Sequence, residues 1–118
     1  MKTTRLVIRI LIALFLSVAV VVHLVGTFFP GKLPEPLWSH VVHIISYGLC
    51  LFTFLRPVKH RVFLFLLGAV YPFMYHANCF FTQLVNSGKF NHICFEVIVI
   101  LPLAALLIWR NEKSSATQ

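Results

Sequence analysis

Charged residues are scarce in this chain: Asp, Glu, Lys and Arg together make up 11% of its 118 residues. Soluble domains carry roughly 25% charged residues, because polar groups must cover their surface. Hydrophobic residues make up 59% instead, which is more than a fold of this size can bury. The composition therefore excludes a soluble enzyme, a disordered segment and a nucleic-acid-binding domain, and it indicates an integral membrane protein.

Cysteine is also rare, with three residues at Cys50, Cys79 and Cys94. An odd number placed inside apolar stretches excludes a disulfide-dense secreted scaffold and predicts buried thiols that act as small hydrophobes. The sequence also lacks the compact metal signatures HExxH and CxxC. No single motif therefore identifies a reaction.

Four apolar runs are long enough to cross the roughly 30 Å hydrocarbon core as helices, which takes about 20 residues. They span residues 10–29, 38–55, 62–85 and 92–109, and charged or turn residues separate them. The connections are short, so consecutive helices must run in opposite directions. The sequence predicts an all-α fold with one domain over residues 1–118, an antiparallel bundle of four transmembrane helices.

The distribution of Lys and Arg predicts the orientation, because cytoplasmic segments near helix ends retain positive charge. The N-terminal segment, the loop at 56–61 and the C-terminal tail hold eight of the ten basic residues, and the other two loops hold only Lys32 and Lys89. Both termini are therefore expected in the cytoplasm, in a plasma (inner) membrane. The net charge of +7 is interpreted as a topology signal, with the lipid bilayer as partner and no nucleic acid.

Five of the six histidines are predicted to lie in the outer half of the bundle. Glu96 is the only carboxylate inside a predicted span. Ionisable groups are costly in hydrocarbon and usually face a bundle interior or a water-filled cavity. We therefore expect a shared polar cavity that opens outward. The histidines concerned are His23 near the end of the first helix, His40 and His43 in the second, His76 in the third and His92 at the start of the fourth.

Helical spacing places these polar residues on one face of each helix, since residues three or four apart share a face. On the second predicted helix, Tyr47 shares a face with His43. On the fourth, His92 and Glu96 share a face, whereas Cys94 is expected to point elsewhere.

This constellation suits a metal ion, a haem or a quinone headgroup. Neutral imidazoles bind zinc, copper, nickel or haem iron, and a carboxylate or a thiol can complete the ligand set. Tyrosine hydroxyls can hydrogen-bond a quinone carbonyl. The candidate metal ligands are His40, His43, His76 and His92. The candidate residues for a bound cofactor are His23, His43, His76, His92, Glu96, Tyr47 and Tyr75.

Two other functions fit the same residues. A proton or cation transporter, or a channel subunit, would use Glu96 and the histidines as a relay, because a carboxylate beside an imidazole can share a proton with it. A structural accessory subunit would satisfy these polar groups among themselves or against a partner. In both cases a bundle this small is expected to form a homo-oligomer or to join a larger membrane complex.

Four sequence segments follow one another in an order that can be compared with known membrane proteins. The basic start RLVIRILIALF leads into a first helix that ends near HLVGTFFPGKLP, the third helix carries YPFMYH, and the fourth ends in LLIWRN. This layout covers nearly the whole chain and resembles the DoxX-like family of small four-helix membrane proteins. The second helix departs from the family pattern, since HVVHIISYG replaces a Gly-rich stretch. The resemblance implies a bacterial inner-membrane bundle in a family where some members are linked to quinone-dependent sulfur oxidation, and it assigns no catalytic residue.

Reporter fusions test the predicted orientation. A phosphatase that is active only outside the cytoplasm should be active when fused after Lys32 and inactive when fused after Lys59 or at the C-terminus, because the basic segments stay inside. The measurement is enzyme activity normalised to the amount of fusion protein. Activity at Lys59 with none at Lys32 would reverse the orientation.

Overall fold

The computed structural model describes residues 2–117, and the regular secondary structure of that part of the chain is entirely helical. Helix α1 spans Lys2–Phe28, α2 spans Leu37–Leu55, α3 spans Arg61–Ser87 and α4 spans His92–Ala116. Each helix is long and apolar enough to cross a membrane. The prediction of an all-α chain with four such helices is therefore confirmed.

Proline and glycine set the ends of the helices. Gly31, with φ of 89°, and Pro36, which immediately precedes α2, keep the first connection out of helical geometry. Arg56 ends α2 in an extended conformation, because the following Pro57 disfavours helical backbone at the residue before it. Gly88 ends α3 in the left-handed conformation with φ of 63°, which glycine adopts without strain.

The outermost helices extend beyond the predicted apolar runs. Helix α1 already begins at Lys2, well before residue 10, and α4 continues to Ala116, past residue 109. An apolar run measures the thickness of hydrocarbon, whereas helical hydrogen bonding continues through charged turns. Lys113 in the last turn of α4 also interacts favourably with the negative end of the helix dipole.

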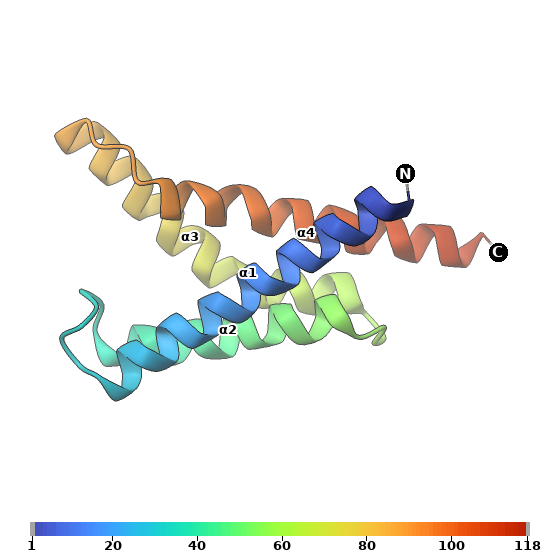
Figure 1. Cartoon of the computed structure of the whole chain (residues 1–118), viewed down its shortest axis with the longest axis horizontal. Helices are drawn as coiled ribbons and strands as arrows, with labels where there is room; N and C mark the ends of the chain where they lie inside the picture. Colours follow the sequence, from blue (N-terminus) through green and yellow to red (C-terminus); the bar gives the residue numbers. More distant parts are fainter. Residues whose placement is uncertain (1, 118) are drawn as a thin grey trace.

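Helices that follow one another in the chain pack side by side and run antiparallel (Figure 1). The connections 29–36 and 88–91 lie at one end of the bundle, called the loop end below, and both termini lie at the other end (Figure 1). Helices α1 and α4 make little contact with each other. The α1–α2 pair and the α3–α4 pair therefore diverge toward the loop end (Figure 1).

The apolar core lies toward the end that carries the termini. Its largest fully buried apolar side chains come from all four helices and include Leu16, Phe54, Phe65, Leu101 and Ile108. Many other large apolar side chains remain exposed along the outside of the helices. Such a surface suits contact with lipid tails rather than with water.

Replacing Gly68 by alanine should destabilise the bundle. A Cβ atom at Gly68 on α3 would lie 2.9 Å from the backbone oxygen of Ser46 and 3.1 Å from Sγ of Cys50, both on α2. The backbone of α2 must shift to accept it, at an expected cost of about 1–3 kcal/mol. The measurement is the melting temperature of the purified protein in detergent.

Gly48→Ala is the matched control for this prediction. A Cβ atom at Gly48 meets nothing within 4 Å, and alanine favours a helix over glycine by about 0.5–1 kcal/mol. Its melting temperature should equal or exceed that of the unmodified chain. Equal melting temperatures for the two variants would contradict the close approach of α2 and α3.

Candidate metal site of histidines and Glu35

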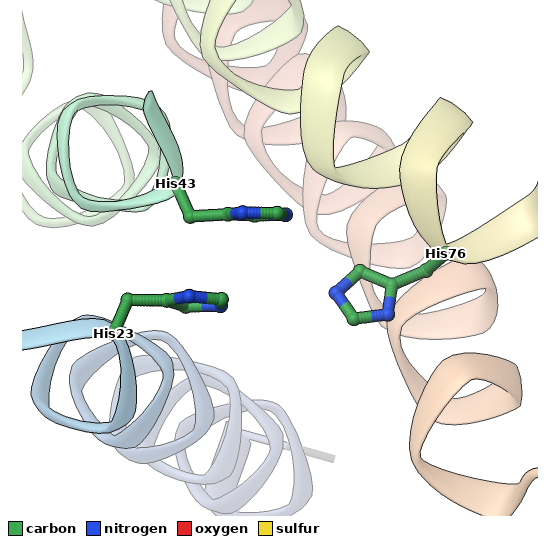
Figure 2. A group of neighbouring side chains, drawn as sticks. All are labelled: His23, His43 and His76. Atoms are coloured by element: carbon green, nitrogen blue, oxygen red, sulfur yellow. The ribbon is translucent and has the colours of Figure 1, made fainter. Parts of the chain in front are cut away.

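Three helices bring buried histidines to one point near the loop end. His23 from α1, His43 from α2 and His76 from α3 point toward one another (Figure 2). His40 on α2 adjoins them, and its ring lies 5.3 Å from that of His23 between centroids. All four side chains are buried, with exposed fractions from 0% for His43 to 8% for His76. Buried polar groups need hydrogen bonds or a ligand, so this concentration of imidazoles requires an explanation.

The rings of His23, His43 and His76 surround a common point. His23 and His43 stack with their centroids 4.1 Å apart and their planes 8° from parallel. The ring of His76 approaches these rings at an angle, with its centroid 5.6 Å from that of His43 and its plane tilted by 60° (Figure 2). One nitrogen of each ring lies within 4.8 Å of the other two. Three ligands converging from three helices are typical of a metal site.

Each of these three histidines has its Nδ1 atom engaged. Nδ1 of His43 lies 2.9 Å from the backbone oxygen of Ser39, and Nδ1 of His23 lies 3.0 Å from Nδ1 of His40. Nδ1 of His76 lies 3.3 Å from Sγ of Cys94. The backbone oxygen of Ser39 can only accept, so His43 carries its proton on Nδ1 and a free lone pair on Nε2, as metal-binding histidines with such outer hydrogen bonds do.

Two Nε2 atoms of the cluster have no hydrogen-bond partner in the described part of the chain. Among residues 2–117, the buried side-chain nitrogen and oxygen atoms without a hydrogen-bond partner are Nε2 of His43 and Nε2 of His76. Leaving a buried polar atom unpaired costs about 1–3 kcal/mol. Two such atoms in one cluster indicate a position that a bound ligand would fill.

Glu35 supplies the negative charge of the cluster. It lies in the first connection between Pro34 and Pro36, and its side chain is 14% exposed. Its Oε2 atom accepts a hydrogen bond from Oγ of Ser39 at 2.9 Å and lies 3.2 Å from Nδ1 of His43. A loop carboxylate thus reaches the buried rings from the loop side.

The electrostatics of Glu35 follow from these contacts. Burial by itself would raise the pKa of the Glu35 carboxyl, but hydrogen bonds from His43 and Ser39 outweigh it and lower the pKa to about 2. The carboxylate is therefore ionised at neutral pH. One negative charge beside these imidazoles favours a bound cation.

A cavity of about 350 Å³ adjoins the histidines in the region where the two helix pairs diverge. His23, Tyr75, His76 and Cys94 lie on its wall, together with apolar residues of α1. The site therefore has free space on one side, where a further ligand of a metal ion can bind.

The structure brings together four of the predicted site histidines, and both predicted tyrosines lie beside them. The ring of Tyr47 lies 5.8 Å from those of His23 and His43, and the ring of Tyr75 packs edge-on against His43 at 4.9 Å. The four histidines are His23, His40, His43 and His76.

His92 and Glu96 do not join the cluster, and the expectation that Cys94 points elsewhere is wrong. Both His92 and Glu96 are exposed, whereas Cys94 is buried and contacts His76. The reason is the azimuth of α4, because residues two apart lie on nearly opposite faces of a helix. Once Cys94 and Val97 face inward, His92 and Glu96 must face outward.

Sequence reasoning missed Glu35, Ser39, Tyr71 and Cys94. Because Ser39 donates its hydroxyl proton to Glu35, it accepts a hydrogen bond from the hydroxyl of Tyr71 at 3.1 Å, and the Tyr71 ring packs edge-on against His43. One signal was present: Glu35 and Ser39 precede His43 at intervals of four residues, so they continue the polar face of the second helix into the loop.

The arrangement of the histidine rings favours a single metal ion over a haem held between His23 and His43. A haem between two histidines needs their rings on opposite faces of the macrocycle. His23 and His43 stack directly on each other, so this pair leaves no such gap. A single metal ion fits the convergence of three nitrogens and one nearby carboxylate.

Comparison of the chain with protein-family models, with curated proteins and with solved structures finds no match. The chemistry of the donor atoms therefore guides the functional interpretation.

Glu35→Gln should destabilise the loop end. The amide removes the charge that accepts hydrogen bonds from Ser39 and His43, at an expected cost of about 1–3 kcal/mol. The measurement is the melting temperature in detergent. Glu96→Gln is the matched control, because Glu96 is exposed and its amide should leave the melting temperature unchanged. A larger loss for Glu96→Gln than for Glu35→Gln would contradict the site described above.

Proposed function

We propose that this chain is a small integral membrane protein that binds a transition-metal ion through His23, His43 and His76. The observation that carries the proposal is the pair of buried, unpartnered Nε2 atoms of His43 and His76, found within residues 2–117. A metal ion satisfies both atoms at once. The contact of His43 Nδ1 with the backbone oxygen of Ser39 supports binding through Nε2, because this oxygen can only accept a hydrogen bond.

The distances require a modest closure of the site around the ion. Zinc binds imidazole nitrogen at about 2.0–2.1 Å, so two nitrogens on a tetrahedral ion lie about 3.3 Å apart. The three nitrogens now lie within 4.8 Å of one another, and ring movements of about 1 Å bring them to that spacing. Imidazole ligands suit zinc, copper, nickel and iron.

Three protein ligands leave a coordination position open, which is typical of metal sites that bind a further molecule. The cavity beside His23 and His76 supports this arrangement, since it offers free space next to these two rings; Glu35 also lies on its wall. The function is thus a metal-binding module whose ion can accept a small exogenous ligand, and a redox role follows if the ion is copper or iron.

The location of the site follows from the membrane topology, which also belongs to the proposal. The basic residues support both termini in the cytoplasm of a plasma (inner) membrane. The metal site then lies in the outer half of the bundle, near the non-cytoplasmic surface. The layout shared with the DoxX-like family supports the same location. A homo-oligomer or a larger membrane complex remains the expected assembly.

Elemental analysis of the detergent-purified chain, prepared without chelators or a histidine tag, tests the metal site. We expect near-stoichiometric zinc, copper or iron, and loss of the metal in the double variant His43→Ala/His76→Ala, because it removes both free Nε2 atoms. His92→Ala is the matched control and should retain the metal, since His92 is exposed.

Circular dichroism separates loss of metal from loss of fold. The double variant should keep the helical content of the unmodified chain. Unmodified protein that is folded, stays metal-free and binds no added Zn²⁺, Cu²⁺ or Fe²⁺ would overturn the proposed function.

A further inference from the structure

A second set of ligand atoms adjoins the three-histidine site on the loop side. It consists of His23, Glu35 and His40, whose ligand atoms lie within 4.8 Å of one another. The Nδ1 atoms of His23 and His40 are 3.0 Å apart, and each lies 4.0 Å from Oε2 of Glu35. This set uses Nδ1 of His23, so Nε2 of the same ring stays available to the first site.

The spacing of this second set suits a metal ion. Two imidazole nitrogens on one tetrahedral ion are about 3.3 Å apart, close to the separation of the two Nδ1 atoms. The two longer separations, 4.0 Å each, both involve Oε2 of Glu35. Two imidazoles and a carboxylate are also a ligand set that zinc commonly takes in proteins.

Gly26 gives independent support, because its missing side chain leaves room for the His40 ring to lie close to His23. A Cβ atom at Gly26 would lie 2.5 Å from Cε1 and 2.6 Å from Nε2 of His40. The ring of His40 therefore occupies the space where a side chain of α1 would otherwise lie, one turn after His23. Any larger residue at position 26 would push His40 away from His23.

We propose that His23, Glu35 and His40 bind a second transition-metal ion, and that the His23 ring bridges it to the first. This inference rests on the proposed function, because a bridging ring needs an ion at its Nε2 atom. With the first ion on Nε2 of His23, the proton between the two Nδ1 atoms belongs to His23, and it would leave to solvent when the second ion binds. His23 is then an imidazolate that donates one lone pair from each nitrogen, and the two cations offset its charge and that of Glu35.

Glu35 is the most exposed ligand of the second site. The side chain of Glu35 is 14% exposed, whereas those of His23 and His40 are 6% and 2% exposed. An ion that enters from the loop end therefore meets Glu35 before it reaches the buried rings.

Zinc stoichiometry tests the inference on the full chain in detergent. The chain is dialysed to equilibrium against Zn²⁺, and the zinc bound per chain is measured by elemental analysis. We expect about two zinc ions for the unmodified chain and about one each for His40→Gln and His76→Gln, since each variant removes a ligand of one site. His23→Gln should lose both ions because its ring serves both sites. The exposed His92→Gln is the control and should keep about two.

The outcomes separate the two proposals. About one zinc ion in both the unmodified chain and His40→Gln would overturn the second site and leave the three-histidine site standing. No zinc in the unmodified chain would overturn both. One zinc ion retained by His23→Gln would overturn the bridge.

A second variant covers the case in which His40→Gln does not fold, as judged by circular dichroism. Glu35→Gln changes a loop side chain and should lower the stoichiometry from about two zinc ions to about one, with a several-fold weaker first site because Glu35 also contacts His43. A stoichiometry of two in folded Glu35→Gln would overturn the second site.

Discussion

The contact of the Glu35 carboxylate with His43 and Ser39 organises the loop end of the bundle. One ionised group on a connecting segment selects the tautomer of the central ring, and that ring stacks on His23 from the neighbouring helix. His76 completes the cluster from the third helix. Apolar packing fixes the other end of the bundle, so the two ends are held by different kinds of interaction.

Much of this arrangement could be predicted from the sequence, because the position of a residue along its helix gives its depth in the membrane. Hydropathy sets where a helix crosses the membrane, and short connections align the ends of neighbouring helices. His23, His43 and His76 could therefore be assigned to one end of the bundle. Helical spacing also predicted the polar face of the second helix. In the structure, His40, His43 and Tyr47 on this face are buried together.

The inward face of the fourth helix and the position of Glu35 could not be predicted from the spacing of residues along the helices. The fourth helix is apolar on most sides, so its sequence does not decide which face turns inward, and a small thiol packs beside His76 more readily than Glu96 would. Glu35 lies outside every predicted helix. Its approach to the rings depends on the conformation of a loop between two prolines, which only the tertiary contacts determine.

The unpartnered Nε2 atoms of His43 and His76 leave the metal-free bundle less stable than its packing alone would make it. An ion that binds only the folded chain adds RT ln(1 + [ion]/Kd) to the free energy of unfolding. If the chain binds metal as proposed, chains made when metal is scarce would open more often and would be degraded faster. The amount of the protein in a cell would then follow the metal supply after synthesis, without any change in transcription.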